Sequence, residues 1–179
     1  MGASKPSDAG LYFQWGDTQG YTAEQVGTGE GKKKFASDES DYKWGKYPNY
    51  TKYTTTGATL ELEDDAAHAN MGGDWHMPTP TQIQELLDNT TSTWTTKDGV
   101  NGRLFTSKKD GTKSIFIPAV GTAANGSVHF SGDNGIVLSS MLSTDYSFKV
   151  QCFHCYLGDA YLDKEQYRYY GLPIRGVIG

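Results

Sequence analysis

Cys152 and Cys155 are the residues whose type and spacing most directly suggest chemistry. A Cys-x-x-Cys pair can act as a redox couple or supply half of a zinc site, and both uses need the two sulfurs on one side of the chain. The neighbouring aromatic and β-branched residues favour a strand, in which positions i and i+3 face opposite ways. The sequence holds no second cysteine pair, and the histidines other than His154 are scattered. We therefore interpret the cysteines as unrelated strand positions and predict neither a metal site nor a cofactor.

Four acidic residues, Glu61, Glu63, Asp64 and Asp65, form the second group that could do chemistry. Paired carboxylates can serve acid–base catalysis or hold calcium, but at the start of a helix they more often offset the helix dipole. Their spacing matches no EF-hand loop. The sequence also has no nucleophile elbow and no phosphate-binding glycine loop after a strand. We predict that these acids are surface charges and that the protein is not an enzyme.

The segment 137–170 is the third candidate, because it mixes tyrosines with serines, aspartates and other charged residues and alternates poorly. Antibody binding sites have a similar composition, in which tyrosine gives rigid contact area and small polar residues adapt to the ligand. An ordinary half-buried sheet would have it too. Composition alone leaves both interpretations open.

Length and charge narrow the class of protein. A chain of 179 residues suits one domain. Its 16 Lys and Arg against 21 Asp and Glu give a net charge of −5, which argues against nucleic-acid binding. No apolar stretch approaches the roughly 18 residues of a membrane helix, so no membrane insertion is expected. The 22 glycines and 13% aromatic residues favour strands and turns.

Two helices are expected ahead of the strands. Apolar residues recur at helical spacing over 60–70, and Gly72 and Gly73 would end that helix. The second helix has stronger signals, with Thr79 as N-cap, Pro80 at the first position and Gln82 completing a capping box. It should end at residues 89–91.

Strands and turns are predicted over the rest of the chain, apart from a polar, irregular segment up to residue 58. The expected strands are 11–17, 103–107, 114–118, 128–131, 136–141, 148–157, 160–162 and 172–178, with hairpin turns at 109–112 and 132–135. Trp75 and Met77 are expected in the core, and Arg175 either at an internal carboxylate such as Asp74 or in solvent. The order of elements predicts one α+β domain over residues 1–179, with residues 1–9 disordered.

Several motifs, in order along the chain, resemble the Fibrobacter succinogenes major paralogous domain family. They are Gly10-Leu11-Tyr12-Phe13-Gln14-Trp15-Gly16-Asp17, Gly72-Gly73-Asp74-Trp75-His76-Met77-Pro78-Thr79, Ile115-Phe116-Ile117-Pro118-Ala119 and Arg168-Tyr169-Tyr170-Gly171-Leu172-Pro173-Ile174-Arg175. The resemblance implies a C-type-lectin-like fold of the formylglycine-generating-enzyme-like branch, with two helices around a small mixed sheet and long loops. The enzyme of that branch uses paired cysteines at a copper site, whose spacing Cys152 and Cys155 do not match. Calcium-dependent lectin motifs are also missing. The resemblance therefore implies the fold without this chemistry.

A subset of proteins with this fold, the variable proteins of diversity-generating retroelements, is similar in a further respect. In them a C-terminal stretch is rewritten to create new binding surfaces, and the departures of this chain from the family pattern cluster in 137–170. The resemblance implies a non-enzymatic display protein on a virion or bacterial cell surface, binding a macromolecular or glycan ligand. The expected contact residues are Leu138, Met141, Tyr146, Phe148, His154, Tyr156, Asp159, Tyr161, Asp163, Glu165 and Tyr167.

Two alternatives remain. One is an undiversified structural domain of a bacterial cell surface, and the other is a metal or thiol oxidase that uses Cys152 and Cys155.

Overall fold

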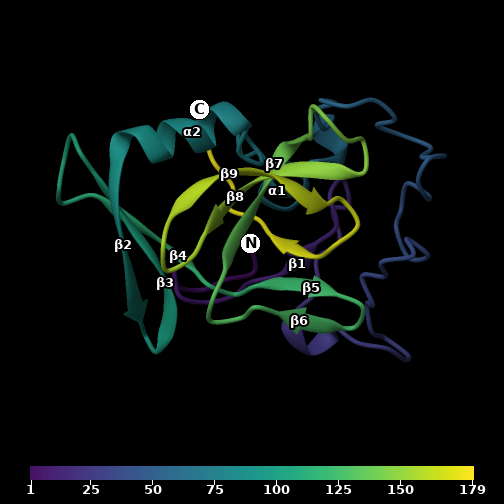
Figure 1. The fold of residues 1–179 in the computed structure, drawn as a ribbon, viewed down its shortest axis with the longest axis horizontal. Helices are drawn as coiled ribbons and strands as arrows, with labels where there is room; N and C mark the ends of the chain where they lie inside the picture. Colours follow the sequence, from purple (N-terminus) through teal and green to yellow (C-terminus); the bar gives the residue numbers. More distant parts are fainter.

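Two α-helices and ten short strands form the domain in the computed structural model, which describes residues 1–179 except the side chain of Lys164. The α+β class is therefore confirmed. In chain order the elements are β1 (Tyr12–Phe13), η1 (Ala23–Gln25), η2 (Leu62–Asp64), α1 (Ala66–Met71), α2 (Pro80–Asn89), β2 (Thr90–Lys97), β3 (Val100–Ser107), β4 (Ser114–Pro118), β5 (Thr122–Ala124), β6 (Ser127–His129), β7 (Gly135–Leu142), β8 (Lys149–Cys155), β9 (Ala160–Tyr167) and β10 (Leu172–Pro173), where η marks a 3-10 helix. Figure 1 shows α2 along one side and the long loop between η1 and η2 along another.

Helix α2 begins where its sequence predicts. The Gln82 backbone N–H donates to the Thr79 hydroxyl at 3.2 Å, and the Thr79 N–H donates to the Gln82 side chain at 2.9 Å. This reciprocal capping box satisfies backbone donors that have no partner within the helix. Ile83 then points into the core, with Leu86 and Leu87 packed beside it. The helix is thereby fixed against the strands that follow it.

The helix expected over 60–70 is instead two elements, η2 and α1. Asp65 separates them because its backbone is extended, and its carboxylate caps α1 by accepting the His68 N–H at 3.0 Å. The same carboxylate accepts the Met77 N–H at 2.8 Å. Asp64 and Asp65 are both buried, so the prediction of four surface charges is wrong for these two.

All strand pairs are antiparallel and form four small sheets, β1-β10, β2-β3-β4, β5-β6 and β7-β8-β9. The expected mixed sheet is therefore wrong for the described strands. The turn at 109–112 joins the paired strands β3 and β4, as predicted. The turn at 132–135 does not close a hairpin, because β6 pairs with β5 while β7 pairs with β8. Strands β2 and β5 were not predicted.

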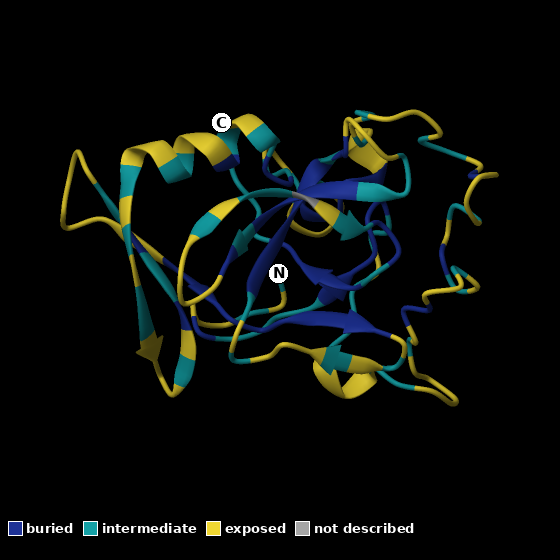
Figure 2. Ribbon diagram, in the orientation of Figure 1, coloured by how far each residue is buried: buried dark blue, intermediate teal, exposed yellow. Residues whose placement is uncertain are grey.

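Strand β7 lies in the interior because apolar clusters cover both faces of its sheet. Ile136, Leu138 and Cys152 belong to one cluster with Phe13, Trp15 and Met77. The neighbouring positions Val137, Phe153 and Cys155 belong to the other, which packs against α2. Figure 2 shows β7 buried over most of its length and β9 mostly half-buried or exposed. The core prediction is confirmed for Met77, whereas Trp75 is only half-buried.

Residues 1–9, expected to be disordered, lie against the domain in this structure. Ser7 is buried, and the Met1 amine donates to the Ile174 carbonyl at 2.7 Å. Arg175 is half-buried and donates to the Pro6 and Asp8 carbonyls, so its hydrogen bonds go to the N-terminal segment and not to Asp74. None of the helices in the described part of the chain combines the length and apolar character needed to cross a bilayer.

Candidate binding surface

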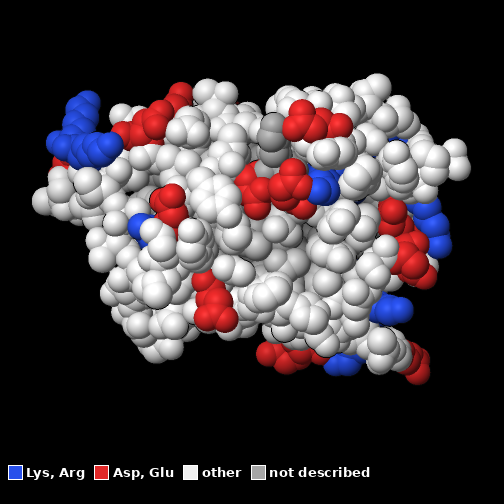
Figure 3. Space-filling view, viewed as in Figure 1, with Lys and Arg blue, Asp and Glu red and all other residues white. Residues whose placement is uncertain are grey.

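Four of the predicted contact residues, Tyr161, Asp163, Glu165 and Tyr167, lie on β9, an edge strand of the sheet β7-β8-β9. Tyr161 lies opposite His154, Asp163 opposite Cys152 and Tyr167 opposite Lys149. Because β7 and β8 are covered on both faces, the exposed side chains gather on β9 and on the connections at its ends. Figure 3 shows acidic groups beside a basic one in the middle of this side of the molecule.

One end of the surface is a cluster of three rings. The ring centroid of His154 lies 5.2 Å from that of Tyr161 and 6.1 Å from that of Tyr156. Nδ1 of His154 is 3.0 Å from the Tyr161 hydroxyl and 3.5 Å from the Asp163 carboxylate. Burial raises the pKa of the Tyr161 hydroxyl, with nearby acids such as Asp163 adding to the effect. Tyr161 therefore stays a neutral hydrogen-bonding group at physiological pH. This end of the surface therefore offers a ligand the apolar faces of aromatic rings together with hydrogen-bonding groups at their edges.

The other end is a second aromatic cluster, built around Phe148. Its ring centroid is 4.9 Å from that of Tyr47, 5.4 Å from that of Tyr146 and 6.1 Å from that of Tyr167. The ammonium of Lys149 lies 5.0 Å from the Tyr146 ring and 5.6 Å from the Tyr167 ring, at cation–π distance. These rings are partly exposed and offer stacking area to a ligand.

Lys149 also forms an ion pair with Glu165, beside the second aromatic cluster. The hydrogen bond to Glu165 is the main cause that raises the pKa of the Lys149 ammonium. Because Glu165 is exposed, the pair is solvated and contributes on the order of 1 kcal/mol at most. The ion pair gives the surface one cationic and one anionic group with which a ligand can form hydrogen bonds.

The eleven predicted contact residues divide by exposure. Five are exposed, namely Tyr146, Tyr156, Asp159, Tyr161 and Glu165. Five are half-buried, namely Met141, Phe148, His154, Asp163 and Tyr167. Leu138 is completely buried, and its assignment to the surface is wrong. It lies opposite Cys152 on the interior strand β7, packed among apolar side chains.

Three residues of this surface, Tyr47, Lys149 and Leu157, were missed by the sequence prediction. Tyr47 is 54% exposed and comes from the long loop between η1 and η2, about a hundred residues before its ring partner Phe148. Leu157 is 72% exposed, in the turn after β8. Nothing local to Tyr47 signals its partner. Leu157, by contrast, is the last residue of the predicted strand 148–157 and stands directly before Gly158, so it could have been assigned to a turn.

Arg168 joins the second aromatic cluster to the loop that carries Tyr47. Its guanidinium is completely buried and lies 4.2 Å from the centroid of the Tyr50 ring. It donates to the Tyr42 hydroxyl at 2.8 Å, to the Tyr53 and Ser147 carbonyls at 2.8 and 3.0 Å, and to the Lys52 carbonyl at 3.3 Å. One side chain therefore holds both the loop and the turn before β8.

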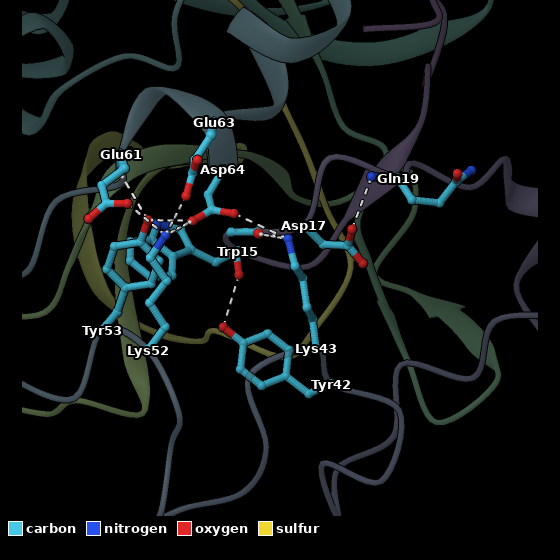
Figure 4. Close-up of polar contacts among 11 residues, drawn as sticks. Trp15, Asp17, Gln19, Tyr42, Lys43, Lys52, Tyr53, Glu61, Glu63 and Asp64 are labelled. Carbon is cyan, nitrogen blue, oxygen red and sulfur yellow. Dashed lines mark hydrogen bonds and ion pairs between the residues drawn. The ribbon is translucent and has the colours of Figure 1, made fainter.

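The acidic group at η2 anchors the same loop, as Figure 4 shows. The ammonium of Lys52 lies 2.7 Å from the Glu61 carboxylate, 3.0 Å from that of Glu63 and 2.6 Å from that of Asp64. The three carboxylates lie close enough together to hold a cation. Here a lysine of the protein supplies the positive charge. Their role in this structure is to fasten the loop to η2.

The two cysteines lie on opposite faces of the sheet, as predicted. Cys152 packs in one apolar cluster and Cys155 in the other, and both side chains are fully buried. Burial raises the pKa of the Cys155 thiol to about 12 and that of Cys152 well above its usual value. A thiol oxidase needs accessible thiolates. The arrangement offers none at these positions.

We expect both thiols to resist a thiol-specific reagent at pH 8. The thiolate form of Cys155 is scarce when its pKa is about 12, and neither sulfur is accessible. Reaction with DTNB should be more than about a hundredfold slower in the native protein than in guanidinium-unfolded protein. The Cys152→Ala and Cys155→Ala variants assign any residual rate to one sulfur. A native thiol that reacts as fast as free cysteine would contradict the buried placement.

Comparisons with protein-family models, with curated proteins and with solved structures give no significant match to this chain. The functional argument therefore depends on the surface itself.

Proposed function

We propose that this protein is a non-enzymatic binding domain whose ligand lies across the β8–β9 surface. The observation that carries the proposal is the pair of ring clusters, one around His154 and Tyr161 and the other around Phe148, on strands backed by a fully packed core. Aromatic rings beside carboxylates and one lysine suit a glycan or a protein on a cell surface, because rings supply contact area and polar groups fix orientation.

We further propose that the fold is C-type-lectin-like, of the formylglycine-generating-enzyme-like branch, and that the protein is a retroelement variable protein displayed on a virion or bacterial surface. Two helices, small sheets and the long loop between η1 and η2 support the fold. The separation of exposed positions on β9 from the packed strand β7 supports the display role. Exposed substitutions usually change stability by less than about 0.5 kcal/mol, so such a surface can vary while the core stays fixed.

The test of tolerance compares exposed and buried positions within 137–170. Single substitutions to serine at Tyr146, Tyr156 and Tyr161 should each cost about 1 kcal/mol or less, measured by guanidinium unfolding. Leu138→Ser should cost at least about 3 kcal/mol, because it leaves a cavity and buries a hydroxyl among apolar groups. If Leu138→Ser is as mild as the tyrosine substitutions, the division into core and display surface is wrong.

The test of binding uses an array of bacterial surface glycans and intact bacterial cells as probes. A triple variant with serine at Tyr146, Tyr156 and Tyr161 should still unfold in one cooperative transition, with a loss no larger than the sum of the three single substitutions, and should lose retention on the probe that holds the parent protein. Tyr21→Ser is the matched control, since Tyr21 packs against Phe35 in a different cluster. If the triple variant is still retained on that probe, the ligand binds at a site other than the β8–β9 surface.

Diversification has its own test in the gene. A neighbouring reverse transcriptase gene and an adenine-rich near-copy of codons 137–170 are expected. Sister genes should differ at the exposed positions and agree at Leu138. Sister genes identical throughout 137–170 would instead favour an undiversified structural domain of a bacterial surface.

A further inference from the structure

A cavity of about 600 Å³ lies on the α2 side of the molecule, away from the ring clusters. Its walls come from α2, from strands β3 and β4, from residues 3–6 and from residues 175–177. This volume falls in the range of small-molecule sites, about 300–1,000 Å³. The elements that form it are distant in sequence, so the cavity depends on the packed fold.

The interior of the cavity is apolar. Ile83 and Leu86 line it from α2, Leu104 and Phe116 from the β-sheet beneath, and Phe153 from β8. Ile83, Phe116 and Phe153 are buried core residues, which makes this part of the wall rigid. An aliphatic group placed here would leave water for hydrocarbon contacts, at about 0.8 kcal/mol for each buried methylene.

The ionisable residues in the lining are all cations, namely Lys5, Lys97 and Arg175. Arg175 uses only its Nη2 to donate to the Pro6 and Asp8 carbonyls; among the described residues, its Nε and Nη1 make no hydrogen bond. These two donors lie on different edges of the planar guanidinium, because its paired edges are Nε with Nη2 and Nη1 with Nη2. Each can therefore donate one hydrogen bond to an anion, but the two do not grip one carboxylate together.

Two acids outside the lining reduce this positive charge. Asp98 lies 3.7 Å from the Lys5 ammonium, and Asp8 lies near Arg175. Three cations against two anions leave one net positive charge beside an apolar cavity. The local charge therefore complements a single negative charge.

We propose that this cavity binds a small amphipathic monoanion, with its aliphatic chain among the apolar side chains and its carboxylate at Arg175 and Lys97. A sugar would find few polar partners inside, and a nucleotide would bring more negative charge than the site balances. The lining of the cavity shares no residue with the two ring clusters, and the proposal does not depend on the function proposed for them.

The test measures binding of decanoate to the full chain by isothermal titration calorimetry. We expect one binding site, an affinity at least about tenfold higher for decanoate than for decanol, and about fourfold tighter binding for each methylene added between hexanoate and decanoate. Lys97→Gln should weaken decanoate binding about two- to fivefold. Lys109→Gln, which removes an exposed lysine outside the cavity, is the matched control and should leave the affinity unchanged.

Leu86→Trp fills the cavity from a half-buried position and should weaken decanoate binding at least about tenfold while the unfolding midpoint shows whether the fold persists. If that variant fails to fold, the effect of Lys97→Gln and the comparison of decanoate with decanol still test the proposal. Equal affinity for decanoate and decanol, or no binding at millimolar decanoate, would overturn the proposal. Sedimentation with phosphatidylglycerol vesicles in place of decanoate binding would assign the cavity to a membrane lipid and overturn it too.

Discussion

Replacing Arg168 by methionine is expected to lower the free energy of unfolding by about 3–5 kcal/mol. The substitution keeps much of the apolar stem and removes every donor of the guanidinium. The Tyr42 hydroxyl and the carbonyls of Lys52, Tyr53 and Ser147 then lose their shared partner. Each buried acceptor left without a hydrogen bond costs about 1–3 kcal/mol before the structure relaxes. This is a large share of the 5–15 kcal/mol that stabilises a typical domain.

Guanidinium unfolding followed by tryptophan fluorescence measures this loss. Arg168→Lys separates charge from geometry, because a lysine keeps the charge but its compact ammonium cannot reach acceptors arranged around a planar fork. It should fall between the parent protein and Arg168→Met. The control Lys34→Met removes an exposed cation whose side chain makes no hydrogen bond or close ion pair in the described structure, and it should stay within about 0.5 kcal/mol of the parent. An Arg168→Met protein with the parent midpoint would show that the hydrogen bonds do not hold the loops.

The binding surface should respond to the same substitution. Arg168 fixes both the loop that carries Tyr47 and the turn before Phe148, whose rings meet 4.9 Å apart. Amide hydrogen exchange over residues 44–53 and 143–148 should therefore rise more in Arg168→Lys than exchange in α2.

Local signals in the sequence predicted the elements that local interactions fix. The helix α2 begins with Thr79, Pro80 and Gln82, whose contacts lie within one turn, and the strand predicted over 114–118 matches β4. The helix expected over 60–70 failed because Asp65 is committed to a distant partner, the Met77 N–H. Strand β2 lacks the alternation of apolar and polar residues that identifies a strand, since five of its eight residues are threonine.

The sequence predicted which segment carries the candidate surface better than it predicted which individual residues are exposed on it. Residues 137–170 do form the sheet and turns that carry the exposed rings. A strand covered on both faces shows no alternation, and β7 is one, so nothing in the sequence distinguished Leu138 from an outward position. Tyr47 and Arg168 act through contacts about a hundred residues away, which periodicity cannot register.

Asp64→Asn is expected to lower the free energy of unfolding by about 2–4 kcal/mol at pH 7. Asp64 is 4% exposed, and its Oδ2 accepts from the Lys52 ammonium at 2.6 Å and from the Tyr53 hydroxyl at 2.7 Å. Its Oδ1 accepts from the Lys43 ammonium at 3.2 Å. An asparagine offers one oxygen, and its amide group would direct N–H donors toward an ammonium. The loop between η1 and η2 would lose its attachment to η2.

The effect should depend on pH in a direction that the site fixes. Burial opposes ionisation of Asp64, but hydrogen bonds from Lys52, Tyr53 and Lys43 outweigh burial and hold its pKa below the usual value. In the unfolded chain an aspartate titrates near about 3.9. The ionised carboxylate therefore stabilises the folded state fully above that pH, and the contribution is lost as pH falls through the lower folded pKa.

The difference in unfolding free energy between the parent protein and Asp64→Asn should therefore be largest near neutral pH and shrink below about pH 4. Urea unfolding at a series of pH values measures it. Asp133→Asn removes an exposed carboxylate without side-chain contacts in the described structure, so its small effect should not change with pH. A constant difference for Asp64→Asn from pH 7 to pH 3 would mean that shape at this position matters and charge does not. The lysines would then lie beside Asp64 without anchoring the loop, and Arg168 alone would fix the position of Tyr47.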